Sequence, residues 1–192
     1  MSCDIANGRV EACKDAISGL LNIYFINYGD LPVPTASNPT YGTGDATDVI
    51  TAFAPDSQLT LYKYELKGAN GFEQTIQTSR DNGTTFFEQV LTVQLKKQDA
   101  ATHKNVKLLA YGRPRIVVET RDHQFFLAGL DQGCDVTAGT VSSGTAMGDF
   151  NGYNLTFTGM EKLPANFLEC TTEAGLQAVF NDGTDDALIV TS

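Results

Sequence analysis

The chain has 192 residues, 42% of them hydrophobic, which is enough to build the core of one domain. No apolar stretch approaches the roughly 18 residues that span a bilayer, and the N-terminus lacks the basic and apolar regions of a signal peptide, so we expect folding in a cytosol. The net charge of −10 argues against tight DNA binding, because phosphate binding requires many Lys and Arg contacts.

The charge is unevenly distributed along the sequence. Acidic residues outnumber basic ones in residues 1–56 and again in residues 121–192, whereas residues 57–120 carry nine Lys and Arg against six Asp and Glu. Two interpretations are open. An acidic surface keeps a protein soluble, and it also repels DNA, which is useful where DNA must slide past.

The first part of the sequence predicts one strand and one long loop. Residues 3–18 have a weakly helical pattern, and residues 17–28 are rich in branched and aromatic side chains, which favours a strand. Residues 31–46 contain three prolines and two glycines, which exclude regular structure. Because such a long loop is unusual inside a compact domain, we expect it to be functional or to wrap a neighbour, with apolar anchors at Leu31, Val33 and Tyr41.

The next segment predicts an antiparallel meander. A short strand covers residues 48–54, and alternating patterns follow at residues 58–67, 72–80 and 84–97. Asp81-Asn82-Gly83 is typical of a hairpin turn, because Asn-Gly readily adopts positive φ. One side of this meander is polar and charged, so it must face water or a polar channel.

The clearest helix covers residues 100–111. Asp99 is its expected N-cap, and Gly112 with Pro114 ends it. Its apolar stripe consists of Val106, Leu109 and Ala110. A hairpin follows, with strands at residues 115–120 and 124–130 and its tip at Asp122-His123.

Residues 139–162 combine a loop of small residues, a turn at residues 148–152 and a strand. Side chains along this strand alternate, with Tyr153, Leu155, Phe157 and Gly159 on one face and Asn154, Thr156, Thr158 and Met160 on the other. The sequence further favours a strand at residues 136–141, a short helix at residues 173–180 capped by Thr171 or Thr172, and a last strand at residues 187–191.

These elements predict a mainly β fold in a single domain of residues 1–192. We expect an antiparallel β-sandwich or barrel of about nine strands, with one flanking α-helix at about residues 99–111. Residues 1–16 are expected to form an N-terminal arm, and residues 31–46 a long Pro/Gly-rich loop or arm.

No arrangement of side chains indicates catalysis, so we predict that the protein is not an enzyme and has no cofactor. His103 and His123 have no Ser or Cys partner in their segments and are expected to be exposed. The four cysteines form no CxxC pair, which argues against zinc and for free thiols; Cys3 and Cys13 are the local pair that a bridge could join.

Two polar clusters leave a calcium-binding module open as an alternative. The first contains Asp149 and Asn151, and the second consists of Asn181, Asp182, Asp185 and Asp186. Neither has the full spacing of an EF-hand, and turn chemistry explains both at least as well, so we predict no metal site.

Residues 109–168 resemble the C-terminal half of the tail tube proteins of tailed bacteriophages. The resemblance rests on the helix that ends at Tyr111-Gly112, the strand pair 116–119 and 125–129, the small-residue loop 143–149, and the strand 152–161 followed by Pro164. It covers about a third of the chain. The tube protein of type VI secretion has a similar fold.

The resemblance implies a β-sandwich or barrel with a flanking helix that assembles into hexameric rings. Rings of this family stack head to tail, and strands of six subunits join into one barrel around a DNA channel with an acidic lining. DNA then passes through the lumen without specific binding, the partners are other copies and other tail proteins, and no membrane is involved. The location implied is the virion tail, assembled in the cytoplasm of the bacterial host. The basic residues at 57–120 depart from an acidic lining if that meander faces the lumen.

We expect subunit contacts at the turn and strand start formed by Asp149, Phe150, Asn151 and Tyr153, because an exposed aromatic turn favours an interface. The loop anchors Leu31, Val33 and Tyr41 are expected to contribute to the same contacts. Two other functions remain open: a different virion protein, such as a head-decoration or baseplate component, and a carbohydrate- or calcium-binding β-sandwich module.

Overall fold

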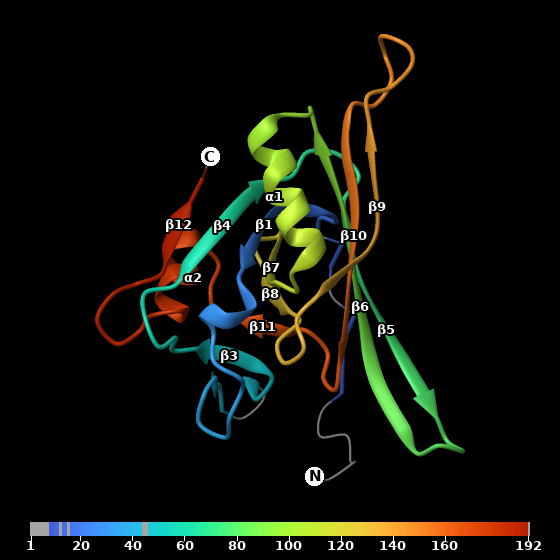
Figure 1. Ribbon diagram of the computed structural model, residues 1–192. Helices are drawn as coiled ribbons and strands as arrows, with labels where there is room; N and C mark the ends of the chain where they lie inside the picture. Colours follow the sequence, from blue (N-terminus) through green and yellow to red (C-terminus); the bar gives the residue numbers. More distant parts are fainter. Residues whose placement is uncertain (1–7, 12, 15, 44–45, 192) are drawn as a thin grey trace.

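Two β-sheets packed face to face dominate the computed structural model, which describes residues 8–11, 13–14, 16–43 and 46–191 (Figure 1). Strands hold 42% of the described residues and helices 13%, which confirms the prediction of a mainly β fold. The two sheets form a sandwich rather than a closed barrel.

The larger sheet has eight strands in the order β12-β4-β1-β7-β8-β11-β3-β2. Their bounds are β1 Leu20–Ile26, β2 Thr40–Tyr41, β3 Val49–Ala52, β4 Thr60–Glu65, β7 Arg115–Thr120, β8 Phe125–Ala128, β11 Asn166–Leu168 and β12 Leu188–Val190. The pairs β11–β3 and β12–β4 are parallel, so this sheet is mixed, and not wholly antiparallel as expected. β2 and β11 were not expected, because strands of two and three residues carry no readable alternation.

The smaller sheet is antiparallel, with the order β5-β6-β10-β9. Its strands are β5 Gly71–Ser79, β6 Thr84–Lys96, β9 Asp135–Ser142 and β10 Gly152–Glu161. The hairpin predicted around residues 81–83 joins β5 to β6, with Ser79 paired with Thr84. The prediction of a three-stranded meander is wrong at its first strand, because β4 pairs with β1 and β12, and residues 66–70 cross from one sheet to the other.

In the described part of the chain, two α-helices and one short 3-10 helix complete the fold: α1 Ala100–Tyr111, α2 Glu173–Val179 and η1 Tyr28–Asp30. Both predicted N-caps are confirmed. The Asp99 carboxylate accepts a hydrogen bond from the Thr102 backbone N–H at 2.8 Å, and the Thr172 hydroxyl accepts one from Gly175 at 3.2 Å. The described residues between positions 3 and 18 contain no helix, and the remainder of that stretch lies outside the description.

Two hydrophobic clusters lie on opposite faces of the larger sheet. The first fills the space between the sheets and includes Ile23, Phe25, Leu91, Val93, Ile116, Val118, Leu155 and Phe157. The second lies between the larger sheet and α2 and includes Tyr24, Ile26, Phe53, Leu61, Val117, Leu127, Leu176 and Phe180. Because each fully buried large side chain contributes roughly 1.5–3 kcal/mol, both faces of the larger sheet stabilise the fold.

The Pro/Gly-rich segment 31–46 is attached to the chain's own sandwich. Leu31 is buried in the core beside α2, and Tyr41 packs partly buried against the same cluster. The fully buried Arg115 side chain donates hydrogen bonds to the Leu31 carbonyl at 2.7 Å and to the Pro32 carbonyl at 3.3 Å. The start of this segment therefore packs on its own sandwich, and the expectation that it wraps a neighbour is corrected there.

Candidate subunit interface

The smaller sheet has one apolar and one polar face. Leu91, Val93 and Leu95 of β6 alternate with partly or fully exposed residues and pack inward, as do Tyr153, Leu155 and Phe157 of β10. The strand register places these buried residues opposite one another, with Val93 beside Leu155 and Leu91 beside Phe157. The predicted alternation of residues 153–160 is thus confirmed, and the other face of the sheet points away from the core.

This outward face is rich in threonine and carries few charges. The register places on it Thr75, Thr92, Thr140, Asn154, Thr156 and Thr158, and Thr137 joins them through a 2.8 Å hydrogen bond to the Thr158 hydroxyl. The register places three acidic side chains on this face, Glu73, Glu88 and Asp135, and one basic side chain, Lys96. The excess of basic residues at positions 57–120 therefore lies mostly elsewhere, on β4, α1 and β7 and in the connections.

Both outer strands of the smaller sheet have a free edge within the described part of the chain. β5 pairs with β6 alone, and β9 pairs with β10 alone. The unpaired N–H and C=O groups of such edges are a template for pairing with a strand of another chain.

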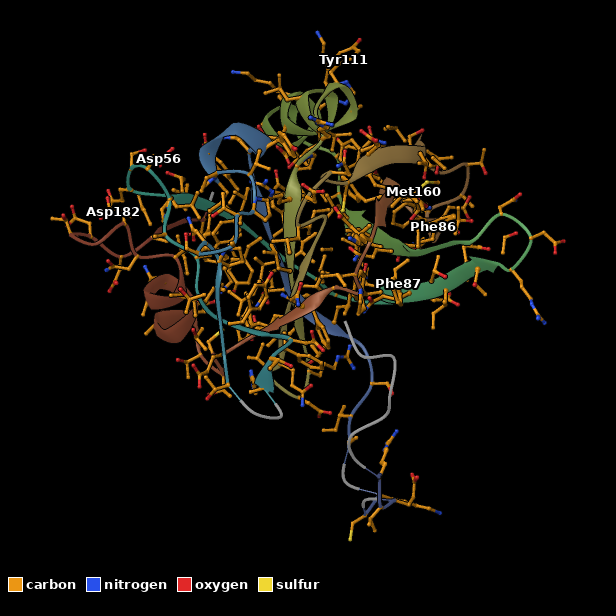
Figure 2. The ribbon with its side chains drawn as sticks, turned by 90° about the horizontal axis from the view of Figure 1, so that it is seen from below. Asp56, Phe86, Phe87, Tyr111, Met160 and Asp182 are labelled. Atoms are coloured by element: carbon orange, nitrogen blue, oxygen red, sulfur yellow. The ribbon has the colours of Figure 1, made fainter. Side chains whose placement is uncertain are left out.

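The β5–β6 hairpin extends beyond the body of the sandwich as a two-stranded ribbon (Figure 1). Ile76 is 63% exposed on it, and Phe86 is exposed as well. Figure 2 shows Phe86 and Met160 on one side of the sheet and Phe87 on the other. An uncovered two-stranded ribbon is only marginally stable in water, so exposed apolar side chains on both sides favour burial against another molecule. The sequence predicted this hairpin, but not that it extends beyond the sandwich with apolar side chains exposed.

The loop between β9 and β10 also projects from the sandwich, at the opposite end from the ribbon tip (Figure 1). The Asp149 carboxylate closes the loop by accepting hydrogen bonds from the backbone N–H groups of Ala146 at 2.7 Å and Thr145 at 2.9 Å. These two bonds and a third from the Thr145 hydroxyl lower the pKa of Asp149. The carboxylate thus shapes the loop in the manner of turn residues.

The predicted contact residues fall into three groups by exposure: exposed, half-buried and buried. Asp149, Asn151 and Val33 are exposed and remain available for a subunit contact. Phe150 and Tyr41 are half-buried.

The prediction for Tyr153 and Leu31 requires correction. Tyr153 is fully buried because it is an inward residue of β10; its hydroxyl donates to the Asp99 carbonyl at 3.3 Å, and its ring lies beside His103. Leu31 is buried because the Arg115 hydrogen bonds hold the backbone of its segment against the core. Neither side chain is accessible to a neighbour in this structure.

A cluster of hydrogen-bonded polar side chains lies under α2 and includes the buried residues Asn22 and Glu119. The Tyr24 hydroxyl lies 3.0 Å from both the Glu119 and the Glu173 carboxylates, and Lys63 forms an ion pair with Glu173. Asn22 donates to Glu119 at 2.6 Å, and His123 lies 3.2 Å from the same carboxyl group. Burial beside two carboxylates raises the pKa of Tyr24, and the hydrogen bond from Lys63 lowers the pKa of Glu173. The cluster connects α2 to β1, β4 and β7.

Two of the cysteines are unsuited to nucleophilic chemistry. Burial raises the pKa of the Cys134 thiol to about 12, and that of Cys170 likewise to about 12. A thiolate is the reactive form, so both groups are inert near neutral pH. Cys3, and with it the considered bridge to Cys13, lies outside the described residues.

Two findings concern metals and membranes. Among the described residues, no three His, Cys, Asp or Glu side chains lie close enough together to hold a metal ion. Within the same residues, no helix has the length and apolar character needed to cross a bilayer.

Comparison with known proteins gave no relatives: no protein family, no curated protein and no solved structure matches the chain.

Proposed function

We propose that this chain is a structural protein of a phage tail, which assembles into stacked hexameric rings and forms the tube through which DNA passes to the host. The observation that carries the proposal is the smaller sheet. It has a packed inner face, a Thr-rich outer face and two free edges, which is what a strand segment of a shared barrel requires.

The dimensions of such a barrel suit a channel. Six copies of a four-stranded sheet give about 24 strands, and barrels of roughly 16–18 strands already enclose an aqueous channel. With strands about 4.8 Å apart and tilted by about 40°, the barrel diameter between backbones is on the order of 50 Å. The Thr-rich face then lines the channel.

The charge of the outward face supports a lining past which DNA slides. Glu73, Glu88 and Asp135 outnumber Lys96 on this face, so phosphates meet repulsion rather than a series of cationic contacts. The hydroxyl and amide groups of Thr92, Thr140, Asn154, Thr156 and Thr158 keep much of the face hydrated, and Val90 and Met160 are apolar residues on the same face. The partners in this proposal are other copies of the chain and other tail proteins, and the location is the virion tail.

Electron microscopy of the purified protein at high concentration tests the proposal. We expect hollow rings with sixfold symmetry, or tubes built from them. A sixfold hollow tube excludes a head-decoration role, and strictly monomeric protein at every concentration contradicts the tail tube role. If a calcium titration or a glycan panel raises the melting temperature of a monomeric chain, the binding-module alternative takes its place.

A further inference from the structure

The two outer strands of the smaller sheet, β5 and β9, are staggered along the sheet. Gly71, the first residue of β5, is level with Thr156 of β10, because both pair with Thr92. Ser142, the last residue of β9, is level with Gly152, which lies four residues further along β10. The sheet is therefore staggered by four residues across its four strands, toward the end at which the β9–β10 loop projects (Figure 1).

This stagger has the size that a closed barrel requires. Strands of a barrel are tilted, so each strand is shifted along its neighbour, and a shift of one residue per strand corresponds to a tilt of about 36°. Barrels typically have tilts of about 35–45°. A second copy placed at the same height around the barrel axis is therefore shifted along its neighbour by about four residues, one for each strand of the sheet. That shift brings the start of its β5 level with the end of β9.

We propose that β9 of each copy pairs antiparallel with β5 of the next copy, shifted by these four residues. All neighbouring strands of the smaller sheet are antiparallel, so β9 runs opposite to β5, and rotation about a ring axis keeps this relation between copies. Because the shift is an even number of residues, each side chain stays on its own face of the sheet. The register pairs Phe72 with Val141, Glu73 with Thr140, Thr75 with Ala138 and Ile76 with Val136, and Thr137 stays the extra residue of the bulge that it forms against β10. The inference deepens the proposed function and rests on its claim that copies of the chain join around an axis.

The proposed register covers apolar side chains that the single chain leaves exposed. Ile76 is 63% exposed and Val141 is 51% exposed, and both lie on the face of the sheet that points to the core. A shift of four residues gives each of them an apolar neighbour on the facing strand, Val136 for Ile76 and Phe72 for Val141. Both neighbours already pack against the core between the sheets. The contact between copies therefore continues the core of each sandwich.

Other registers that keep the same faces fit less well. A shift of two residues leaves both Ile76 and Val141 beyond the end of the facing strand. A shift of six residues places them beside Gly139 and Gln74, so neither meets an apolar side chain. With no shift, Glu73 lies directly beside Asp135, and like charges in opposite positions are destabilising.

Disulfide trapping reads the register directly. Four double variants combine E73C or T75C on β5 with A138C or T140C on β9, and all four positions are exposed on the outward face. Under mild oxidation we expect bonds between copies to form at least tenfold faster in E73C/T140C and T75C/A138C than in E73C/A138C and T75C/T140C. Positions directly opposite one another are within reach of a disulfide, whereas positions two residues out of register are about 7–8 Å apart.

The bonds in these variants can form only between copies. β5 and β9 of one chain have two strands between them, which separates them by roughly 14 Å, and a disulfide cannot span that distance. Cys3→Ser and Cys13→Ser are included in every variant to remove these two other thiols.

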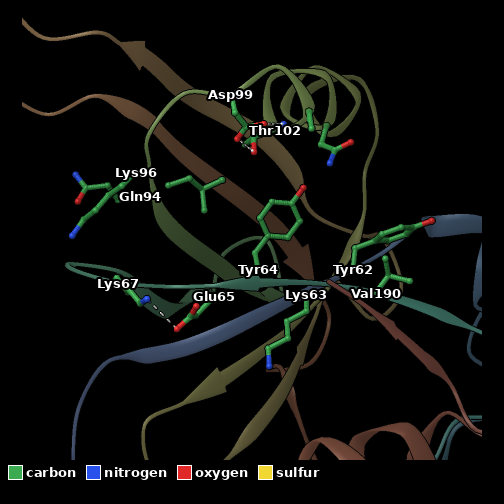
Figure 3. A pocket seen from close by; sticks show the side chains of 13 residues that line it. Tyr62, Lys63, Tyr64, Glu65, Lys67, Gln94, Lys96, Asp99, Thr102 and Val190 are labelled. Atoms are coloured by element: carbon green, nitrogen blue, oxygen red, sulfur yellow. Dashed lines mark hydrogen bonds and ion pairs between the residues drawn. The ribbon is translucent and has the colours of Figure 1, made fainter. Parts of the chain in front are cut away.

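A truncation on the core-facing side tests the apolar part of the contact. Ile76→Ser should weaken association about tenfold, whereas Ile76→Val should preserve it. Leu108→Ser is the matched control, because Leu108 is 59% exposed and lines the groove beside α1, the hollow between this helix and β4 that Figure 3 shows around Tyr62 and Tyr64. None of the described residues that line this groove belongs to β5 or β9. Equal losses for Ile76→Ser and Leu108→Ser would contradict the register.

Electron microscopy of the same variants separates this inference from the proposed function. If sixfold rings form and the out-of-register combinations bond as fast as the others, or no combination bonds, the inference is wrong and the ring assembly stands. If the in-register bonds form in particles without a hollow sixfold ring, the strand pairing is correct and the proposed function fails. If neither rings nor bonds form, both claims fail.

Discussion

The Arg115 guanidinium donates a 2.7 Å hydrogen bond to the Leu31 carbonyl oxygen, deep in the sandwich. The same side chain reaches the Leu130 carbonyl at 2.9 Å and the Tyr28 carbonyl at 3.3 Å. A buried cation is costly unless its donors are satisfied, and here backbone carbonyls satisfy them. Arg115 thus connects η1, the start of the Pro/Gly-rich loop and the segment that follows β8.

Arg115→Met should destabilise the fold by about 3 kcal/mol, because it leaves several buried carbonyl groups without a donor. The free energy of unfolding from urea titration measures the effect. Arg113→Met is the control: Arg113 stacks 4.0 Å above the Tyr28 ring but is exposed, so its loss should cost less than about 1 kcal/mol. Equal losses for both variants would contradict the anchoring role of Arg115.

The two faces of β10 should respond differently to truncation. Phe157→Ala removes a fully buried ring between the sheets and should cost about 3–5 kcal/mol. Thr156→Ala changes the outward face and should stay within about 0.5 kcal/mol in the monomer. Chemical denaturation of both variants checks the assignment, and a large loss for Thr156→Ala would place that residue inside a core.

The contact between α2 and the larger sheet should lose stability in acid, because Glu173 becomes protonated. The hydrogen bond from Lys63 lowers the pKa of Glu173 in the folded protein, so the unfolded chain binds the proton more readily. The resulting stabilisation is present above the ordinary Glu pKa of about 4.3 and is lost as pH falls through the lowered folded pKa. The effect is small, because the Glu173 side chain is 42% exposed and partly screened by water.

Glu173→Gln should therefore flatten the fall in melting temperature between about pH 5 and pH 3, relative to the unchanged chain. Glu169→Gln, at an exposed position before the same helix, serves as the matched control and should leave the acid slope unchanged. An acid slope that is identical in all three proteins would show that the Lys63–Glu173 pair makes no contribution to stability.

A positive charge on the Thr-rich face should make assembled tubes retain DNA. In the proposed tube, Thr156→Lys adds one positive charge per subunit to a channel lining that otherwise does not bind DNA. Each contact between a lysine and a DNA phosphate strengthens binding, and this gain falls as the salt concentration rises. Fluorescence anisotropy of a short duplex should show binding to T156K tubes at low salt and its loss as salt increases. Ser57→Lys on an exposed loop is the control with the same charge. Equal retention by both variants would show that Thr156 does not face the channel.

Local patterns of the sequence predicted the local structure well. Asp99 and Thr172 cap their helices as expected, and the Asn82-Gly83 turn sets the β5–β6 register, because these features depend on residues close together in the sequence. The alternation from Tyr153 to Phe157 also predicted which side chains are inside. The same alternation places Tyr153 with the core residues. The expectation that Tyr153 is exposed came from the turn that precedes it, and the alternation was the better guide.

Long-range features could not be predicted in this way. The connection from Leu66 to Asn70 has the composition of a hairpin turn, yet it carries the chain from one sheet to the other. A buried arginine such as Arg115 has no local signal either, because its partners are carbonyl groups of two distant segments, residues 28–31 and Leu130. The free edges and the groove beside α1 depend on which strands pair, and this is settled by packing between distant parts of the chain.

The most direct test of the tail tube proposal is the symmetry and inner diameter of particles formed by the purified protein, measured by cryo-electron microscopy. The account predicts sixfold rings around an open channel, with strands of the four-stranded sheets joined edge to edge and Thr156 facing the lumen. Particles in which these sheets face outward, or a protein that stays monomeric at all concentrations, would contradict it.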